Sequence, residues 1–224
     1  MVIENIPRKS AIISLSGGLD SSTLLYEYRD GVALAVSFDY GSRHNKQEIS
    51  CASRLCKLLN IEHKTISLSF IEENFVSNLL MGQGSIPKAE YDADNMASTV
   101  VPFRNGIMLS ILAGMAESSN LKYILIANHF GDHFIYPDCR ESFVKPMSIA
   151  IEQGTSNNVK LIAPYTLLSK ADIVQRGNCL SVPYEYTYSC YCGGEKHCGE
   201  CATCRERKAA FRETGIADPT IYML

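Results

Sequence analysis

Apolar runs alternate along this chain with stretches in which apolar side chains recur at helical spacing. The runs at 11–15 and 32–38 are almost wholly apolar and predict buried strands. Further strands are predicted at 63–67, 122–127 and 159–164. Helices are predicted from about residue 20 to residue 30, at 48–59, 106–118, 141–154 and 205–211, and from 169 onward. Strands that alternate with helices predict an α/β fold with a parallel sheet.

A glycine-rich turn joins the first strand to the first helix. Gly17 and Gly18 permit positive φ angles and let an anion approach without a Cβ in the way. Backbone N–H groups converge at such a turn, and the helix dipole favours negative charge there. Ser16, Ser21 and Ser22 add hydroxyl groups. We interpret the turn as a phosphate-binding loop, although an ordinary turn with a Ser or Asp helix cap is the alternative. It is not a Walker A loop, because the lysine of that motif is missing.

Polar residues follow the second predicted strand, beside the first crevice of a βαβ unit. Asp39 ends the strand, and Tyr40, Arg43 and His44 are expected where an adenine, ribose or phosphate would lie. A polar loop with a chance histidine is the alternative. The stretch 69–98 is too long for a simple connection and predicts a lid or an insertion.

Two further groups of polar residues belong to the same region of the predicted fold. Arg104 begins a helix that would flank the crevice, where it could pair with a phosphate or carboxylate; a solvated helix cap is the alternative. Asn128, His129 and Asp132 follow the fourth strand, at the sheet edge where α/β folds place ligands. Lys170 opens a later helix and is expected at the surface unless it faces the crevice.

The segment 135–140 is dense in functional side chains. Asp138 and Arg140 could hold a polar heterocycle through paired hydrogen bonds. Cys139 lies between them, and nothing nearby in the sequence requires a nucleophile, so we expect it in the wall of a site.

Composition narrows the class of protein. The chain has 224 residues, of which 46% are hydrophobic and 20% charged, as in a globular protein with one sizeable core. The net charge of −3 gives no reason to expect a nucleic-acid partner. No signal peptide or membrane span is expected, and the simplest location is the cytoplasm. Nine cysteines in a reducing compartment favour metal binding or catalysis over disulfides.

Five of these cysteines fall between residues 190 and 204. Cys198, Cys201 and Cys204 are separated by two residues each, which is the spacing of a zinc knuckle. Cys190, Cys192 and His197 all remain candidates for the fourth ligand. An iron–sulfur cluster is the competing interpretation, because soft thiolates bind either metal centre. Four thiolates would close the site to substrate, so a structural role is expected.

The order of these motifs resembles one family. The Ser-Gly-Gly-x-Asp-Ser stretch at 16–21 resembles the PP-loop of N-type ATP pyrophosphatases. Together with the stretches 39–41, 101–105 and 136–140 and the cysteine knuckle, it resembles the 7-cyano-7-deazaguanine synthase family over about residues 11–211. Members turn 7-carboxy-7-deazaguanine, ammonia and ATP into the nitrile through an adenylated carboxylate and an amide. The resemblance implies a Rossmann-like sheet of the adenine nucleotide alpha hydrolase type over 1–180 and a small zinc-binding region over 181–224.

The resemblance also implies site residues, cofactors and partners. ATP, with Mg²⁺ on its pyrophosphate, would be held by Leu15, Ser16, Gly17, Gly18, Leu19, Asp20, Ser21, Ser22, Thr23, Leu24, Leu25, Asp39, Tyr40, Arg43 and His44. The substrate would be held by Arg104, Asn128, His129, Asp132, Tyr136, Asp138 and Arg140. The catalytic residues would be Asp20, Ser21, Arg104, Asp138 and Arg140. Zn²⁺ would be held by Cys190, Cys198, Cys201 and Cys204, with Cys192 as a departure from the family pattern. A homodimer is expected, with no nucleic-acid or membrane partner.

The sequence also allows rival functions. A PP-loop enzyme that transfers sulfur to tRNA should show a basic surface or an RNA-binding domain, and neither is evident in the sequence. An enzyme that uses the same adenylated deazaguanine to modify a macromolecule has no sequence feature against it. A zinc-knuckle binding module on an inert nucleotide fold would bind ATP without turnover, but the loop acid Asp20 is present.

Overall fold

The computed structural model describes residues 5–88 and 91–223, and it contains a five-stranded parallel sheet in the order β3-β2-β1-β4-β5. The strands are β1 Ala11–Ser14, β2 Val32–Asp39, β3 Glu62–Ser67, β4 Tyr123–Leu125 and β5 Lys160–Ile162. The α-helices are α1 Leu19–Glu27, α2 Asn45–Leu59, α3 Ser69–Asn74, α4 Ala93–Met96, α5 Arg104–Ser118, α6 Glu141–Gly154, α7 Lys170–Cys179 and α8 Ala202–Thr214. All five predicted strands and the predicted parallel sheet are confirmed.

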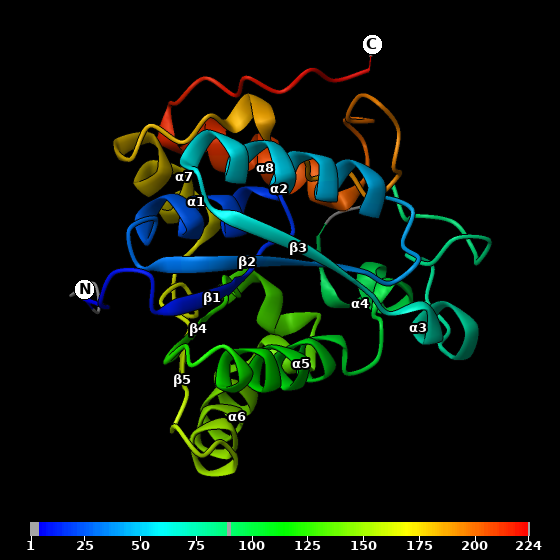
Figure 1. Ribbon diagram of the computed structural model, residues 1–224. Helices are drawn as coiled ribbons and strands as arrows, with labels where there is room; N and C mark the ends of the chain where they lie inside the picture. The colour runs from blue at the N-terminus through cyan, green and yellow to red at the C-terminus, as the bar shows by residue number, and fades with distance from the viewer. Residues whose placement is uncertain (1–4, 89–90, 224) are drawn as a thin grey trace.

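Helices cover both faces of the sheet. In Figure 1, α1, α2, α7 and α8 lie on one face, and α5 and α6 lie on the other. Successive side chains of a strand point to opposite faces, so Ile13 packs with the first group and Ile12 with the second. Burial on both faces explains why β1 and β2 are apolar throughout.

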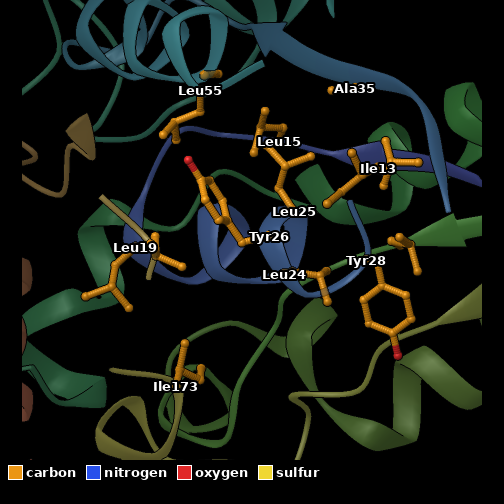
Figure 2. Packing of buried hydrophobic residues seen from close by; sticks show 14 of the residues in the cluster. Ile13, Leu15, Leu19, Leu24, Leu25, Tyr26, Tyr28, Ala35, Leu55 and Ile173 are labelled. Atoms are coloured by element: carbon orange, nitrogen blue, oxygen red, sulfur yellow. The ribbon is translucent and has the colours of Figure 1, made fainter. Parts of the chain in front are cut away.

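The first group of helices packs on the sheet in one of two buried hydrophobic clusters. Figure 2 shows Leu24 and Leu25 of α1 gathered with Leu15, Leu55 and Ile173 in one buried cluster. Phe211 of α8 belongs to the same cluster, so the cysteine-rich C-terminal segment packs directly on the main sheet layer.

Sheet topology places a ligand site between β1 and β4. The chain passes from β1 to β2 and β3 on one side and then returns to β4 and β5 on the other. Loops at the carboxyl ends of β1 and β4 therefore diverge and leave a crevice at this switch point. No helix in the described part of the chain is long and apolar enough to cross a membrane.

The stretch 69–98, predicted to be a lid or an insertion, contains only short elements among its described residues, 69–88 and 91–98. These are α3, α4 and the start of the 3₁₀ turn Ala97–Thr99. Arg43 fastens its middle part, because the guanidinium donates hydrogen bonds to the carbonyl oxygens of Asn78, Gln83 and Gly84.

Candidate active site

The glycine-rich turn has the local geometry of an anion cradle. Gly17 has φ +87° and packs so closely on α2 that an added Cβ would lie 2.2 Å from the carbonyl oxygen of Glu48. Gly18 is the N-cap of α1. Ser16 Oγ accepts a hydrogen bond from the Gly18 N–H and lies 3.0 Å from Ser21 Oγ. Both hydroxyls therefore lie inside the turn, beside the positive end of the helix dipole.

A cavity opens beside this turn, at the carboxyl edge of the sheet. The sequence-predicted residues that line it are Leu15, Ser16, Gly18, Leu19, Asp20, Ser21, Tyr40, His44, Arg104, Asn128, Asp132, Tyr136 and Cys139. These residues come from segments far apart in the sequence, and the fold brings them around one cavity. The predicted residues outside the cavity lining are Gly17, Ser22, Thr23, Leu24, Leu25, Asp39, Arg43, His129, Asp138 and Arg140.

Only the first turn of α1 reaches the cavity. Leu24 and Leu25 are fully buried in the sheet-facing core. Thr23 Oγ1 donates to the carbonyl oxygen of Leu19 and lies 2.9 Å from the hydroxyl of Tyr184. The second half of the helix is therefore packed in the core, and only the first half contributes to the cavity wall.

Three of the predicted site residues form hydrogen bonds with backbone groups of nearby loops and helices. Asp138 accepts a hydrogen bond from the Asn105 N–H at 2.8 Å, which fixes the first turn of α5 next to Arg104. Arg140 is exposed and donates from Nε to the carbonyl oxygen of His133. Asp39 is exposed and accepts from the Gly41 N–H. These contacts position loops around the cavity.

A buried cluster of charges forms one end of the cavity. The ammonium of Lys170 lies 3.1 Å from Asp20 Oδ2 and 2.8 Å from Glu206 Oε2. His129 is 1% exposed, and its Nδ1 accepts from the Gly131 N–H. The opposite ring nitrogen of His129, Nε2, lies 3.4 Å from Asp132 Oδ1. Lys170 thus faces the crevice, which is the alternative to a surface position that the sequence left open, because α7 begins at the same sheet edge as the glycine-rich turn.

Charge pairing outweighs burial at Lys170 and at Asp132, whereas burial prevails at Glu206. Burial disfavours the charge of Lys170, but Asp20 and Glu206 raise the pKa of its ammonium above the ordinary value. Burial also opposes ionisation of Asp132, yet His129 and Lys170 hold the pKa of this carboxyl below its usual value. The pKa of Glu206 is raised, mainly by burial.

Aromatic side chains and one guanidinium form the other end of the cavity. Arg104 Nη1 donates to the Tyr40 hydroxyl at 3.1 Å. The hydroxyls of Tyr136 and Tyr191 lie 3.2 Å apart, and the Tyr191 ring stacks on His44 with centroids 5.0 Å apart. This end offers flat apolar surfaces around one fixed positive charge, which suits a planar heterocycle that carries an acid group.

Two buried groups beside this end are held neutral. Burial raises the pKa of the Glu48 carboxyl to about 8, and Arg104 only partly offsets it. Burial, helped by Arg104, lowers the pKa of His44 to about 3. Burial also raises the pKa of the Cys139 thiol well above its ordinary value, so Cys139 is a poor nucleophile at neutral pH.

Several lining residues escaped the sequence analysis. The polar ones are Ser14, Ser37, Asn45, Glu48, Tyr91, Asn105, Tyr188, Ser189, Tyr191 and Thr203, and Lys170 was expected there only as an alternative to the surface. Position at the carboxyl end of a strand is a signal that could have identified Lys170, since α7 follows β5. Tyr91 and Tyr191 lie in irregular segments, where no periodic pattern marks the direction of a side chain.

All five C-terminal cysteines gather at the start of α8. The sulfur atoms of Cys190, Cys192, Cys198 and Cys201 lie within 4.8 Å of one another. Cys204 Sγ lies 4.0 Å from Cys198 Sγ, and Cys201 Sγ lies 4.0 Å from Cys190 Sγ. A tetrahedral zinc site with Zn–S bonds of about 2.3 Å requires sulfur atoms about 3.8 Å apart. The thiol cluster therefore fits zinc.

Two sets of four thiols could bind the zinc, and both contain Cys190, Cys198 and Cys201. Cys192, which is exposed, and Cys204, which is buried, compete to complete the set. His197 is unsuited to the role, because its Nε2 accepts a hydrogen bond from the Ser189 N–H.

Comparison with known proteins identifies the family. The model of the family described as queuosine biosynthesis protein QueC matches residues 10–215. The chain belongs to the QueC family. A QueC relative from Porphyromonas gingivalis is 55% identical over 214 residues, covering 96% of this chain and 97% of the relative. Another from Desulfotalea psychrophila is 47% identical over 216 residues, covering 96% of this chain and 99% of the relative. Both relatives are named 7-cyano-7-deazaguanine synthase.

A solved structure shares the fold of this QueC chain at low sequence identity. NMN synthetase from Francisella tularensis aligns with a TM-score of 0.53 and 17% identity, over 94% of this chain and 79% of that chain. The likeness confirms the Rossmann-like sheet.

Proposed function

We propose that this chain converts 7-carboxy-7-deazaguanine and ammonia to 7-cyano-7-deazaguanine at the expense of ATP, in queuosine biosynthesis. The observation that carries the proposal is one cavity with two unlike ends in a QueC-family chain. One end combines the glycine-rich turn with Lys170, and the other surrounds Arg104 with tyrosines. The carboxylate of the substrate and the triphosphate of ATP would meet between these two ends.

ATP phosphates fit the first end. The N–H groups at the start of α1, with the hydroxyls of Ser16 and Ser21, face the cavity as donors. The ammonium of Lys170 supplies the positive charge that a Walker A lysine supplies elsewhere. Tyr40 and His44, which belong to the aromatic end of the same cavity, would contact the nucleoside of ATP.

A divalent cation fits the same end. The carboxyl groups of Asp20, Asp132 and Glu206 surround the single ammonium of Lys170, which leaves an excess of carboxylates. Asp20 Oδ1 is buried and has no hydrogen-bond partner among residues 5–88 and 91–223. Carboxylate oxygens and phosphates are the ligands that Mg²⁺ prefers. When bound, Mg²⁺ would neutralise charge on the pyrophosphate, and Asp20 and Asp132 would hold it.

The substrate fits the second end. Arg104 would pair with the carboxylate, and the rings of Tyr136 and Tyr191 would pack on the deazaguanine. Asn128 lines the cavity, and its buried Oδ1 has no partner in the described part of the chain, so it can accept a hydrogen bond from an N–H of the base. Asp138 and Arg140 act by positioning the surrounding loops.

The chemistry then follows from positioning and charge. A substrate carboxylate oxygen attacks the α-phosphorus of ATP, and pyrophosphate leaves toward Lys170 and the N-terminus of α1. Ammonia attacks the acyl carbon, AMP departs, and a proton is lost from nitrogen, which gives the amide. The amide oxygen attacks the α-phosphorus of a second ATP and pyrophosphate leaves, after which loss of AMP and two N–H protons gives the nitrile. These groups act by orientation and electrostatic stabilisation, without a protein nucleophile.

Zinc has a structural role in this proposal. Cys190, Cys198, Cys201 and Cys204 would bind it, and Cys192 would remain outside the set. Cys201 is the N-cap residue of α8, so the metal would fix the start of the helix that packs on α7 and carries Glu206. The homodimeric state and the cytoplasmic location expected from the resemblance belong to the same proposal.

Substitution of the loop acid tests the ATP site. Asp20→Asn should abolish AMP release from ATP and 7-carboxy-7-deazaguanine, because it removes a carboxylate proposed to hold the cation. Thermal unfolding and zinc content should stay those of the unaltered chain, since Asp20 lies at the cavity wall. AMP release at the rate of the unaltered chain would refute this role of the loop.

A further inference from the structure

Helix α8 connects the thiol cluster to the ATP end of the cavity. Cys204 and Glu206 lie two positions apart in its first turns. Two positions along an α-helix correspond to a rotation of about 200° about its axis, so the two side chains point to nearly opposite sides. The thiol of Cys204 accordingly faces the other cysteines, and the carboxylate of Glu206 faces Lys170.

Two carboxylates from different elements hold the Lys170 ammonium. Glu206 Oε2 of α8 lies 2.8 Å away and Asp20 Oδ2 of α1 lies 3.1 Å away. The side chains of Glu206, Lys170 and Asp20 are 15%, 17% and 21% exposed, so water screens these pairs only weakly.

The two carboxylates that pair with Lys170 are expected to differ in their contacts when ATP binds. Asp20 stands in the phosphate-binding turn and would be drawn to the cation when ATP binds. Glu206 lines no part of the cavity and keeps its contact with Lys170. Its second oxygen, Oε1, faces His129 Nε2 at the longer distance of 3.9 Å, so the closer partner is the ammonium.

We propose that Glu206 is a positioning residue that fixes the ammonium of Lys170 against the phosphate-binding turn, so that the thiol-bearing helix acts on ATP binding. The inference rests on the proposed function, in that ATP phosphates must bind at this turn. The thiol cluster would then affect ATP binding as well as stability, because a displaced α8 would carry Glu206 away from Lys170.

A double-mutant cycle tests whether Glu206 acts through Lys170. The probe is α,β-methylene ATP with Mg²⁺, which the enzyme cannot cleave between the α and β phosphates, and the readout is its affinity by calorimetry. Glu206→Gln should weaken binding by about tenfold or more in the unaltered chain, and by less than about twofold in a Lys170→Met background. Glu213→Gln, an exposed residue of the same helix, is the matched control and should leave affinity unchanged.

The outcomes separate this inference from the function on which it rests. Failure of the unaltered chain to bind the probe would refute the proposed ATP site itself. Normal affinity in Glu206→Gln, or equal losses with and without Lys170, would overturn the positioning role alone. Zinc content and thermal unfolding are measured on each variant. If Glu206→Gln loses zinc or its fold, Glu206→Asp replaces it, and unaltered affinity in that shortened variant would overturn the role.

Discussion

Replacement of Gly17 by alanine tests the packing of the phosphate-binding turn. The residue has φ +87°, a conformation that costs an L-residue with a side chain ~1–2 kcal/mol. The new Cβ would lie 2.2 Å from the carbonyl oxygen of Glu48 and 2.8 Å from the backbone nitrogen of Ala52. Both obstacles are backbone atoms of α2, so the turn or the helix must shift, and overpacking of this kind costs ~1–3 kcal/mol.

The combined free-energy cost is ~2–5 kcal/mol, which for a chain of this size lowers Tm by ~4–20 °C. Differential scanning calorimetry measures this directly. Gly18→Ala is the matched control, because Gly18 has φ −75° and its Cβ would meet Ser16 Oγ at 3.2 Å and no backbone atom closer than 3.5 Å. We expect Gly18→Ala to keep its Tm within ~2 °C but to bind α,β-methylene ATP more weakly, since its methyl group narrows the cradle.

The contrast between the two variants refutes or supports the reasoning. If Gly17→Ala unfolds at the temperature of the unaltered chain, the close approach of the turn to α2 is wrong. If Gly18→Ala loses as much stability as Gly17→Ala, the cost arises from the glycine-rich sequence in general and the specific contact with α2 is refuted.

Three further predictions concern the thiols and one buried acid. Cys201→Ser should lose zinc and soluble yield together, because structural zinc contributes folding free energy; a metal-free, active variant would contradict this. Cys192→Ser should keep its zinc, measured by atomic absorption, and metal loss would make Cys192 the fourth ligand. Folding raises the pKa of Glu48 from 4.5 to about 8, so stability should fall as pH rises through this window. The free energy of unfolding of Glu48→Gln, measured in urea, should not show this fall with pH. Identical pH profiles for the variant and the unaltered chain would refute the role of Glu48.

Local sequence was sufficient to predict the glycine-rich turn between β1 and α1 and the parallel sheet. Gly17, Gly18 and Ser16 act through backbone geometry within a few residues, and the buried strands follow from apolar runs. The capping box at Ser169 and Asp172 is likewise a local pattern, and it marks the start of α7 as predicted. Such features depend little on the rest of the molecule.

Side-chain direction in loops depended on tertiary contacts and could not be predicted. Arg43 and Arg140 resemble phosphate or substrate ligands in the sequence, yet the structure uses both to hold backbone carbonyl groups. Lys170 and Glu206 are 36 positions apart and meet only because α7 and α8 pack together. Tyr191, which stacks on His44, lies in a segment with no periodic pattern.

The ligand set of the thiol cluster shows the same limit. Spacing identified Cys198, Cys201 and Cys204, because two-residue separations bring thiols to one centre in any short turn. The structure brings Cys190 and Cys192 to the cluster as well, so Cys192 and Cys204 compete for the last place beside Cys190, Cys198 and Cys201. Spacing alone therefore leaves that ligand open.

The central claim is that the cavity unites ATP with 7-carboxy-7-deazaguanine. The most direct measurement incubates the purified chain with this acid, ATP, Mg²⁺ and ammonium, and follows AMP release together with the mass of the product. We expect 7-cyano-7-deazaguanine to accumulate with AMP, and neither to form when the acid is omitted. AMP release that is independent of the acid, or a protein that binds zinc and ATP but forms no nitrile, would contradict the account.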